Sequence, residues 1–201
     1  MKPLLITLLW GAFLLSGCII TRSPGFHSGY RRLPAQEQET IRFLPADAPL
    51  PTDADGHLYA VTAQSLLRAL PADNTTLVYL WSPHCRGRYC ASLQSVEADC
   101  HRNGYEFQAV AAYYADLVQI KLQAPLQHPL LAINHRYYRS DYCRKYARLF
   151  QAALRLDRPL PDSLQHAQYY VFHGRTFVRA LNALPGVPSQ PLLAPPLRRF
   201  H

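Results

Sequence analysis

Residues 75–100, TTLVYLWSPHCRGRYCASLQSVEADC, decide the fold that this chain is expected to adopt. Residues 77–81 are apolar and rich in β-branched and aromatic side chains, a pattern that predicts a buried strand. Ser82-Pro83 ends that strand, because proline has no N–H group to donate to a neighbouring strand. From about residue 88 to residue 103 apolar side chains recur at helical spacing, and Gly104 supplies the left-handed residue that ends many helices. The stretch therefore predicts a strand, a short loop and an amphipathic helix.

Two cysteines, Cys85 and Cys90, follow the predicted strand. A thiol at Cys85 would lie at the N-terminus of the predicted helix, where backbone N–H groups and the helix dipole favour the thiolate. Arg86, Arg88 and His84 are expected to lower its pKa further, because a nearby cation stabilises a thiolate. We therefore expect Cys85 to be a nucleophile. The alternative is a cysteine held in a stabilising disulfide with Cys90.

A bridge between Cys85 and Cys90 depends on where the helix begins. Residues five apart in a regular helix lie on different faces, outside the ~4.4–6.8 Å window of Cα separations that a disulfide needs. If Cys85 lies in the loop before the helix, Gly87 allows the chain to fold back toward Cys90. Cys90 is then the candidate resolving thiol.

Residues 80–85 (LWSPHC) resemble the strand-end signature of thioredoxin-like proteins, above all the envelope-anchored members in which a Trp lies four residues before the first active-site cysteine. The resemblance extends over about residues 73–181. It implies an α/β, thioredoxin-like fold with a central mixed sheet flanked by helices, and an activity in thiol–disulfide exchange without a cofactor. In that activity Cys85 would attack and Cys90 would resolve. The residues that would shape the active-site loop are Trp81, Pro83, His84 and Arg88.

Two features differ from the family pattern. The family places its second cysteine three residues after the first, where this chain has Arg88, so the spacing here is C-x4-C. The family also has a cis-proline at the start of the closing hairpin, a position that corresponds to Ala167 in this chain, and the nearest upstream proline is Pro161. Both differences favour a second hypothesis, a redox-inactive thioredoxin-fold lipoprotein that acts as a binding or structural module.

The rest of the chain predicts further strands and helices around this unit. Strands 76–81 and 105–113 are expected to be parallel, because a strand, a helix and a strand of these lengths form a right-handed βαβ crossover. The segment between Asp116 and Leu154 resembles the strand–helix insertion of redoxin and peroxiredoxin-related proteins. The other expected elements are a strand at 57–62, a helix capped by Thr62, a helix after Asp116, a helix capped by Ser140-Asp141, and a hairpin of 168–172 with 175–181. Residues 129–134 predict a further short strand, with an extended loop as the alternative.

The first eighteen residues have the pattern of an export signal. Lys2 is followed by the apolar run 4–15, which is too short for a comfortable membrane span, and Leu15-Ser16-Gly17-Cys18 matches a bacterial lipobox. The motif implies cleavage of the signal peptide 1–17 and a diacylglycerol on the thiol of Cys18. The alternatives are an uncleaved anchor and an ordinary secretory signal.

The lipobox and the composition of the chain set the expected domains. Residues 18–52 have little periodic apolar pattern and are expected to be a linker from the lipid anchor, although residues 41–44 offer a short strand. Residues 53–184 are the expected thioredoxin-like domain, and the Pro-rich residues 185–201 an extended tail. We expect the cell envelope as the location, lipid-anchored. Ile19 after the lipidated residue favours the outer membrane, facing the periplasm or the surface.

Charge restricts the expected partners. The net charge of +8 suits an anionic membrane surface, which the lipid on Cys18 would reach. Envelope proteins with thiols or disulfides are the other expected partners. Nucleic acid is not expected, because the chain is exported and carries no recognition motif.

Two further cysteines, Cys100 and Cys143, remain outside the loop. In an oxidising compartment we expect a structural disulfide between them, worth ~3–4 kcal/mol in the chain-entropy model, with two buried thiols as the alternative. No metal is expected, since the soft ligands of the chain show no C-x2-C or H-x3-H spacing.

Overall fold

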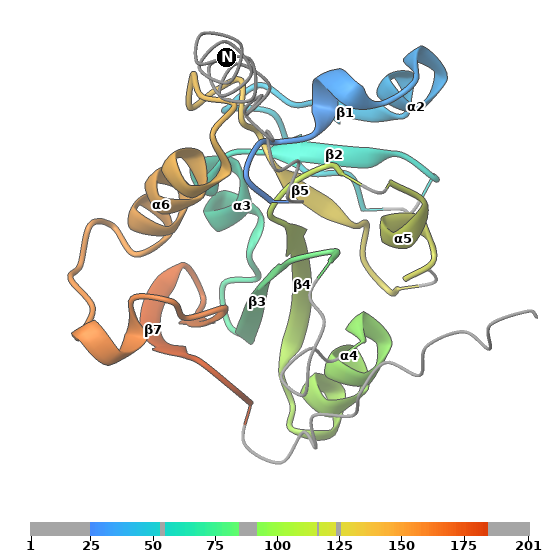
Figure 1. The fold of residues 1–201 in the computed structure, drawn as a ribbon. Coiled ribbons are helices and arrows are strands. Elements are labelled where there is room, and N and C mark those ends of the chain that lie inside the picture. The colour runs from blue at the N-terminus through green and yellow to red at the C-terminus, as the bar shows by residue number, and fades with distance from the viewer. Residues whose placement is uncertain (1–24, 53–54, 85–91, 116, 124–125, 185–201) are drawn as a thin grey trace, which may run out of the picture.

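The computed structural model describes residues 25–52, 55–84, 92–115, 117–123 and 126–184. They form a seven-stranded mixed sheet with helices on both faces (Figure 1). The strands are β1 (Ile41–Phe43), β2 (Leu58–Val61), β3 (Thr75–Trp81), β4 (Glu106–Ala111), β5 (Leu131–Ile133), β6 (Tyr169–His173) and β7 (Thr176–Leu181). The helices are α2 (Ala35–Glu39), α3 (Ala63–Ala69), α4 (Leu93–Arg102), α5 (Leu117–Lys121) and α6 (Cys143–Leu154), with 3-10 turns η1 (Tyr30–Arg32) and η2 (Asp162–Leu164). The predicted α/β class is confirmed.

The strand order is β1-β2-β5-β4-β3-β6-β7. Strands β1, β2, β5, β4 and β3 run parallel, and β6 and β7 close the sheet as an antiparallel hairpin beside β3. The predicted βαβ unit is confirmed, because β3 and β4 pair in parallel with α4 between them in the chain. Strand β5 is inserted between β2 and β4. The order is compatible with a thioredoxin-like sheet that carries an added strand.

Alternate side chains of β3 pack into two separate hydrophobic cores, one on each face of the sheet. Val78 and Leu80 pack with the buried side chains of α3 and α6 on one face of the sheet. Leu77, Tyr79 and Trp81 pack with α4 and α5 on the other face. A strand that is buried on both faces is apolar throughout, which is why the run at residues 77–81 is visible in the sequence.

Two of the predicted helix signals are confirmed. Thr62 caps α3 in a capping box, in which the N–H of Ser65 donates to Thr62 Oγ1 at 3.0 Å and the N–H of Thr62 to Ser65 Oγ at 3.1 Å. Gly104 follows α4 with φ +72°. The chain therefore enters α3 and leaves α4 at the expected positions.

The start of α4 was predicted too early. The helix begins at Leu93, because Ser92 has extended backbone angles and its hydroxyl caps the N–H of Ser95. Residues 85–91, which include Cys85, Arg88 and Cys90, lie outside the described residues. Cys18, the signal peptide 1–17 and the tail 185–201 lie outside them as well.

The predicted cap of α6 is also wrong. Tyr142 is the N-cap residue and makes no side-chain cap. The carboxylate of Asp141 instead accepts a hydrogen bond from the hydroxyl of Ser28, and its other oxygen lies 3.3 Å from His27 Nδ1. A partner 113 residues away in sequence thus competes with the local capping role.

Residues 25–52 belong to the folded domain, so the predicted linker 18–52 is wrong for this part. Strand β1 adds an edge to the sheet beside β2. Ser28 donates its N–H to Asp141 O at 2.9 Å and accepts the N–H of Tyr114 on its own carbonyl at 2.7 Å. The elements here have three to five residues each, too short for an apolar period to show.

The expected Cys100–Cys143 disulfide is also corrected. Both cysteines are buried free thiols. Cys100 belongs to the core under α4, and Cys143 to the core under α6, on the other face of the sheet. The alternative of two thiols packed as small apolar side chains describes them.

Candidate functional site

Five parallel strands end at one edge of the sheet, and in an α/β fold a site is expected just outside these carboxyl ends. This carboxyl edge lies at the ends of β1, β2, β5, β4 and β3 (Figure 1). Cys85 follows the last residue of β3 by only four positions. The residues that leave β2, β5, β4 and β3 at this edge are Thr62, Asn134, Ala112 and Ser82.

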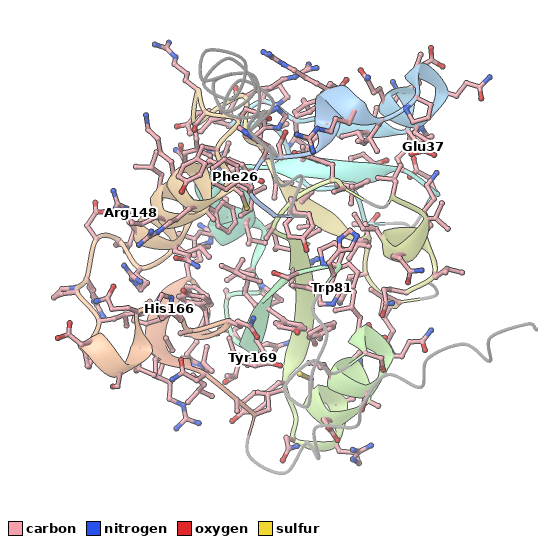
Figure 2. All side chains as sticks on the ribbon, in the orientation of Figure 1. Phe26, Glu37, Trp81, Arg148, His166 and Tyr169 are labelled. Carbon is pink, nitrogen blue, oxygen red and sulfur yellow. The ribbon has the colours of Figure 1, made fainter. Side chains whose placement is uncertain are left out.

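The chain that leaves β3 is held by the residues after β4. Trp81, which is labelled in Figure 2, is 5% exposed. Its carbonyl accepts the N–H of Ala112 at 2.8 Å. His84 then donates its backbone N–H to the hydroxyl of Tyr113 at 3.0 Å. The His84 imidazole stacks on the Tyr113 ring, with centroids 5.9 Å apart and 21° between the planes. The approach to Cys85 is thus fixed as far as the preceding residue.

The structure brings together three of the predicted loop-shaping residues. Trp81 is buried, and Pro83 and His84 are partly exposed at the carboxyl edge. The fourth, Arg88, and both predicted catalytic thiols, Cys85 and Cys90, fall outside the described residues.

Residues 25–29 lie against the residues that follow β4 and those at the start of α6. The carbonyl of Phe26 accepts the N–H of Cys143 at 3.0 Å. Gly29 has φ +79°, and a Cβ built on it would lie 2.7 Å from the backbone nitrogen of Ala115. Only glycine fits that position without a shift of the backbone, so the segment is held closely against the residues that follow β4.

Asp141 joins this segment to α6 in an arrangement of a serine, a histidine and an aspartate. The hydroxyl of Ser28 donates to Asp141 Oδ1, and His27 Nδ1 lies 3.3 Å from Oδ2. In a nucleophilic triad the serine hydroxyl donates to the imidazole, and the imidazole to the carboxylate. Here the serine donates to the carboxylate directly, so the cluster is a structural clamp and not a hydrolytic site.

His135 lies beside the clamp in an aromatic enclosure. Its side chain is 7% exposed, and its ring centroid lies 5.3–6.1 Å from the rings of Tyr30, Phe43, Tyr114 and Tyr146. Among the described residues, no group forms a hydrogen bond with its buried Nδ1. Burial lowers the pKa of His135 to about 4, and the nearby Asp141 carboxylate only partly opposes this. The imidazole is therefore neutral at pH 7.

Cys143 is the described thiol nearest to the carboxyl edge. Its Sγ lies 3.7 Å from the carbonyl oxygen of Ala112, which also accepts the hydroxyl of Tyr146 at 2.6 Å. Burial raises the pKa of the Cys143 thiol above its ordinary value. Burial raises that of Cys100 to about 12, and the carboxylate of Glu97 adds to the rise. Both thiols are therefore protonated at neutral pH and are poor nucleophiles.

Two cavities that described residues line lie away from this edge. The larger, of 420 Å³, opens at the amino ends of β3 and β4 beside Thr76 and Glu106. The smaller, of 190 Å³, is lined in part by Cys100 and Arg179. Within the described ranges no three His, Cys, Asp or Glu side chains gather as metal ligands, and every helix is too short or too polar to span a bilayer.

Comparison with known proteins gives no further identification. No protein-family model, curated protein or solved structure matches this chain. The interpretation of the site therefore depends on its own geometry.

Sequence reasoning missed Tyr113, Ser28 and His27 as parts of the carboxyl edge. One signal could have found Tyr113, because it ends the predicted strand 105–113 and the carboxyl ends of parallel strands meet at one edge. For Ser28 and His27 the sequence gives no signal, since they reach the edge only through contacts with Asp141 and Tyr142.

Proposed function

We propose that this chain is a lipid-anchored, thioredoxin-like protein of the bacterial cell envelope that carries out thiol–disulfide exchange. The observation that carries the proposal is the hydrogen bond from the His84 N–H to the Tyr113 hydroxyl at the end of β3. It fixes His84, the residue before Cys85, at the carboxyl ends of the parallel strands of the sheet. A nucleophile on a rigid support is positioned for repeated attack on a disulfide.

The reaction proceeds in two exchanges. The thiolate of Cys85 attacks one sulfur of a substrate disulfide, which forms a mixed disulfide and releases the other substrate sulfur as a thiolate. The thiolate of Cys90 then attacks the Cys85 sulfur, which releases the second substrate thiolate and leaves a Cys85–Cys90 disulfide. The substrate gains two electrons, and an envelope dithiol must return two electrons to the protein.

The cationic side chains around Cys85 support this role. Arg86 and Arg88 follow it closely in sequence, and a cation within ~4–6 Å lowers a thiol pKa by about one unit or more when the pair is partly buried. From an ordinary pKa of about 8.5, a shift of one to two units would turn a few per cent of thiolate at pH 7 into a large fraction. The two thiols that the structure describes, Cys100 and Cys143, differ from this expectation for Cys85, because burial raises their pKa.

The lipid anchor on Cys18 is the second part of the proposal. It is supported by the lipobox Leu15-Ser16-Gly17-Cys18. Six residues separate Cys18 from Gly25, the first described residue. Acyl chains at Cys18 would therefore hold the folded domain close to a bilayer.

The decisive experiment compares single cysteine variants of the full chain in a disulfide-reduction assay with a dithiol as electron donor. Cys85→Ser is expected to lower the rate at least a hundredfold. Cys90→Ser is expected to accumulate a mixed disulfide with the substrate, detectable by mass spectrometry. Cys100→Ser serves as the matched control and should keep the parent rate. A parent protein without reductase activity, or a Cys85→Ser variant with unchanged activity, contradicts the proposal.

The start of α4 favours the second candidate, a redox-inactive binding or structural module. The N–H of Leu93 donates to Gln123 Oε1, and that of Ser95 to Ser92 Oγ, each at 3.2 Å. Two of the first N–H groups of the helix are thus already bound, and fewer remain to stabilise a thiolate. Disulfide mapping separates the candidates, because a Cys85–Cys90 bridge that glutathione does not reduce supports the binding module.

A further inference from the structure

We propose that the exposed basic side of α6 docks on an anionic phospholipid bilayer. This side, named the α6 face below, consists of four cationic residues and three apolar ones. The cationic residues are Arg139, Arg144, Lys145 and Arg148, and the apolar ones are Phe26, Tyr142 and Leu149. The inference rests on the proposed lipid anchor for its orientation, and on the described residues for its chemistry.

Because of the helical repeat of α6, most of its large apolar side chains are buried on one side of the helix and its cationic side chains are exposed on the other. Tyr146, Phe150 and Leu154 are fully buried against the sheet. Arg144 and Arg148 are one helical turn apart and lie on the solvent side of the helix. Figure 2 shows Arg148 on the outer side of α6.

Large apolar side chains lie exposed among these cations. Phe26 is 53% exposed, Leu149 42% and Tyr142 37%. The rings of Phe26 and Tyr142 contact each other edge to face, with centroids 5.0 Å apart. Aromatic rings beside Lys and Arg side chains are typical of surfaces at the membrane interface, where the rings reach the acyl boundary and the cations the headgroups.

The charge of this region is strongly one-sided. Residues 135–148 contain five Arg or Lys side chains and one carboxylate, Asp141. That carboxylate is already engaged by Ser28 and His27. The fifth cation, Arg136, lies over the rings of Phe43 and Tyr30, at 3.9 and 4.7 Å from their centroids, and is not part of the α6 face, because both rings pack with the core on the other face of the sheet. The complement of such a surface is a dense layer of phosphate groups.

The amino-terminal chain brings the α6 face near the proposed anchor. Phe26 is part of that face and lies eight residues after Cys18. An extended chain spans at most ~3.6 Å per residue, so Cys18 and Gly25 are separated by at most about 25 Å. Of the surfaces of the domain, the one that carries Phe26 is therefore kept within reach of the bilayer. An anionic bilayer fits both the apolar and the cationic side chains, whereas a soluble polyanion needs the cations alone.

The three lysines of the chain allow a direct test. Lys145 lies on the α6 face, Lys121 at the end of α5 is exposed on a different element, and Lys2 is in the signal peptide. The mature lipidated protein, which begins at Cys18, is purified from membranes and reconstituted in vesicles of phosphatidylcholine alone or with one third phosphatidylglycerol. Both samples are acetylated briefly with an amine reagent, and mass spectrometry measures each lysine. We expect at least threefold lower reactivity of Lys145 in the anionic vesicles and no change for Lys121.

Paired variants separate specific docking from general attraction. Arg144→Gln with Arg148→Gln should remove the protection of Lys145. Arg175→Gln with Arg179→Gln, which deletes two exposed arginines at β7, is the matched control and should keep it. The proposal is overturned by equal Lys145 reactivity in both kinds of vesicle, by equal protection of Lys121, or by protection with duplex DNA but not with anionic vesicles.

The outcome also distinguishes failure of the anchor from failure of the docking. Protein that does not float with neutral vesicles contradicts lipidation of Cys18. The protection of Lys145 by added anionic vesicles still tests the α6 face in that case. The Cys85→Ser assay is independent of both.

Discussion

Tyr113 accepts the backbone N–H of His84 on its hydroxyl and stacks on the His84 ring, which couples the ends of β3 and β4. This contact predicts the effect of Tyr113→Phe. The variant removes the acceptor of a part-buried hydrogen bond from a side chain that is only 5% exposed, so the free energy of unfolding should fall by about 1 kcal/mol. The rate of disulfide reduction should fall several-fold, because the residue before Cys85 is no longer fixed. Chemical unfolding and the reductase assay measure the two effects. Tyr137→Phe, at an exposed tyrosine, is the control, and equal rates in both variants would contradict the coupling.

Thr62→Ala removes the capping box of α3. The N–H of Ser65 then has no side-chain partner, and the loss should destabilise the domain by about 1 kcal/mol. Urea unfolding followed by circular dichroism measures it. Ser95→Ala, at an exposed position inside α4, should leave stability unchanged within about 0.5 kcal/mol.

His135 predicts loss of stability at acidic pH. Its pKa is lowered to about 4 in the folded protein, against about 6.5 when unfolded. The unfolded state therefore binds more protons between these values, so stability falls as the pH decreases from 6.5 to 4, by up to about 3 kcal/mol in total. Below pH 4 and above pH 6.5 this contribution is constant.

The pH dependence is measured by urea unfolding at a series of pH values. His135→Phe should flatten the slope between pH 4 and 6.5, whereas His166→Gln, at an exposed histidine in the loop before β6, should keep it. An unchanged slope in His135→Phe would assign the effect to other groups.

Gly29→Ala should be strongly destabilising. Alanine at this position would have to adopt a left-handed backbone conformation, and its Cβ would lie 2.7 Å from the backbone nitrogen of Ala115. We therefore expect the free energy of unfolding to fall by about 2–4 kcal/mol. Gly56→Ala separates the two causes. Gly56 has φ +81° with open space around it, and its substitution should cost only about 1–2 kcal/mol. Equal losses in both variants would mean that the clash at Gly29 is relieved.

Thiol labelling tests the buried cysteines. In the folded, reduced protein a maleimide should react with Cys100 and Cys143 only after unfolding, because burial raises both pKa values and excludes the reagent. Cys85 and Cys90 should react first. Mass spectrometry of peptides resolves the order. Rapid labelling of Cys143 in folded protein would contradict its place in the core.

The sequence predicted the elements whose signal is local. The apolar run of β3, the cap at Thr62 and the left-handed Gly104 are set by neighbours in the chain, and the structure has all three. The parallel pairing of β3 and β4 followed from the βαβ rule.

The predictions that failed depended on distant contacts. Asp141 was expected to cap α6 and instead binds Ser28. Residues 25–52 show no periodic apolar pattern, because their helices and strand have only three to five residues each. Contacts with the edge of the sheet, which the sequence does not reveal, hold them in place. The disulfide between Cys100 and Cys143 was excluded by the sheet between them, which sequence spacing does not reveal.

Residues 25–29 are bonded to the carboxyl edge through Ser28 and Phe26, on the side from which the amino-terminal chain arrives. A force applied to that chain therefore acts first on the hydrogen bonds that the N–H groups of Tyr114 and Cys143 donate to Ser28 and Phe26, and only then on the interior of the sheet. If a bilayer holds the chain at Cys18, mechanical stress from the membrane is applied first to residues 25–29 and their contacts after β4. Force-dependent exposure of Cys143 would then report how firmly the domain is tethered.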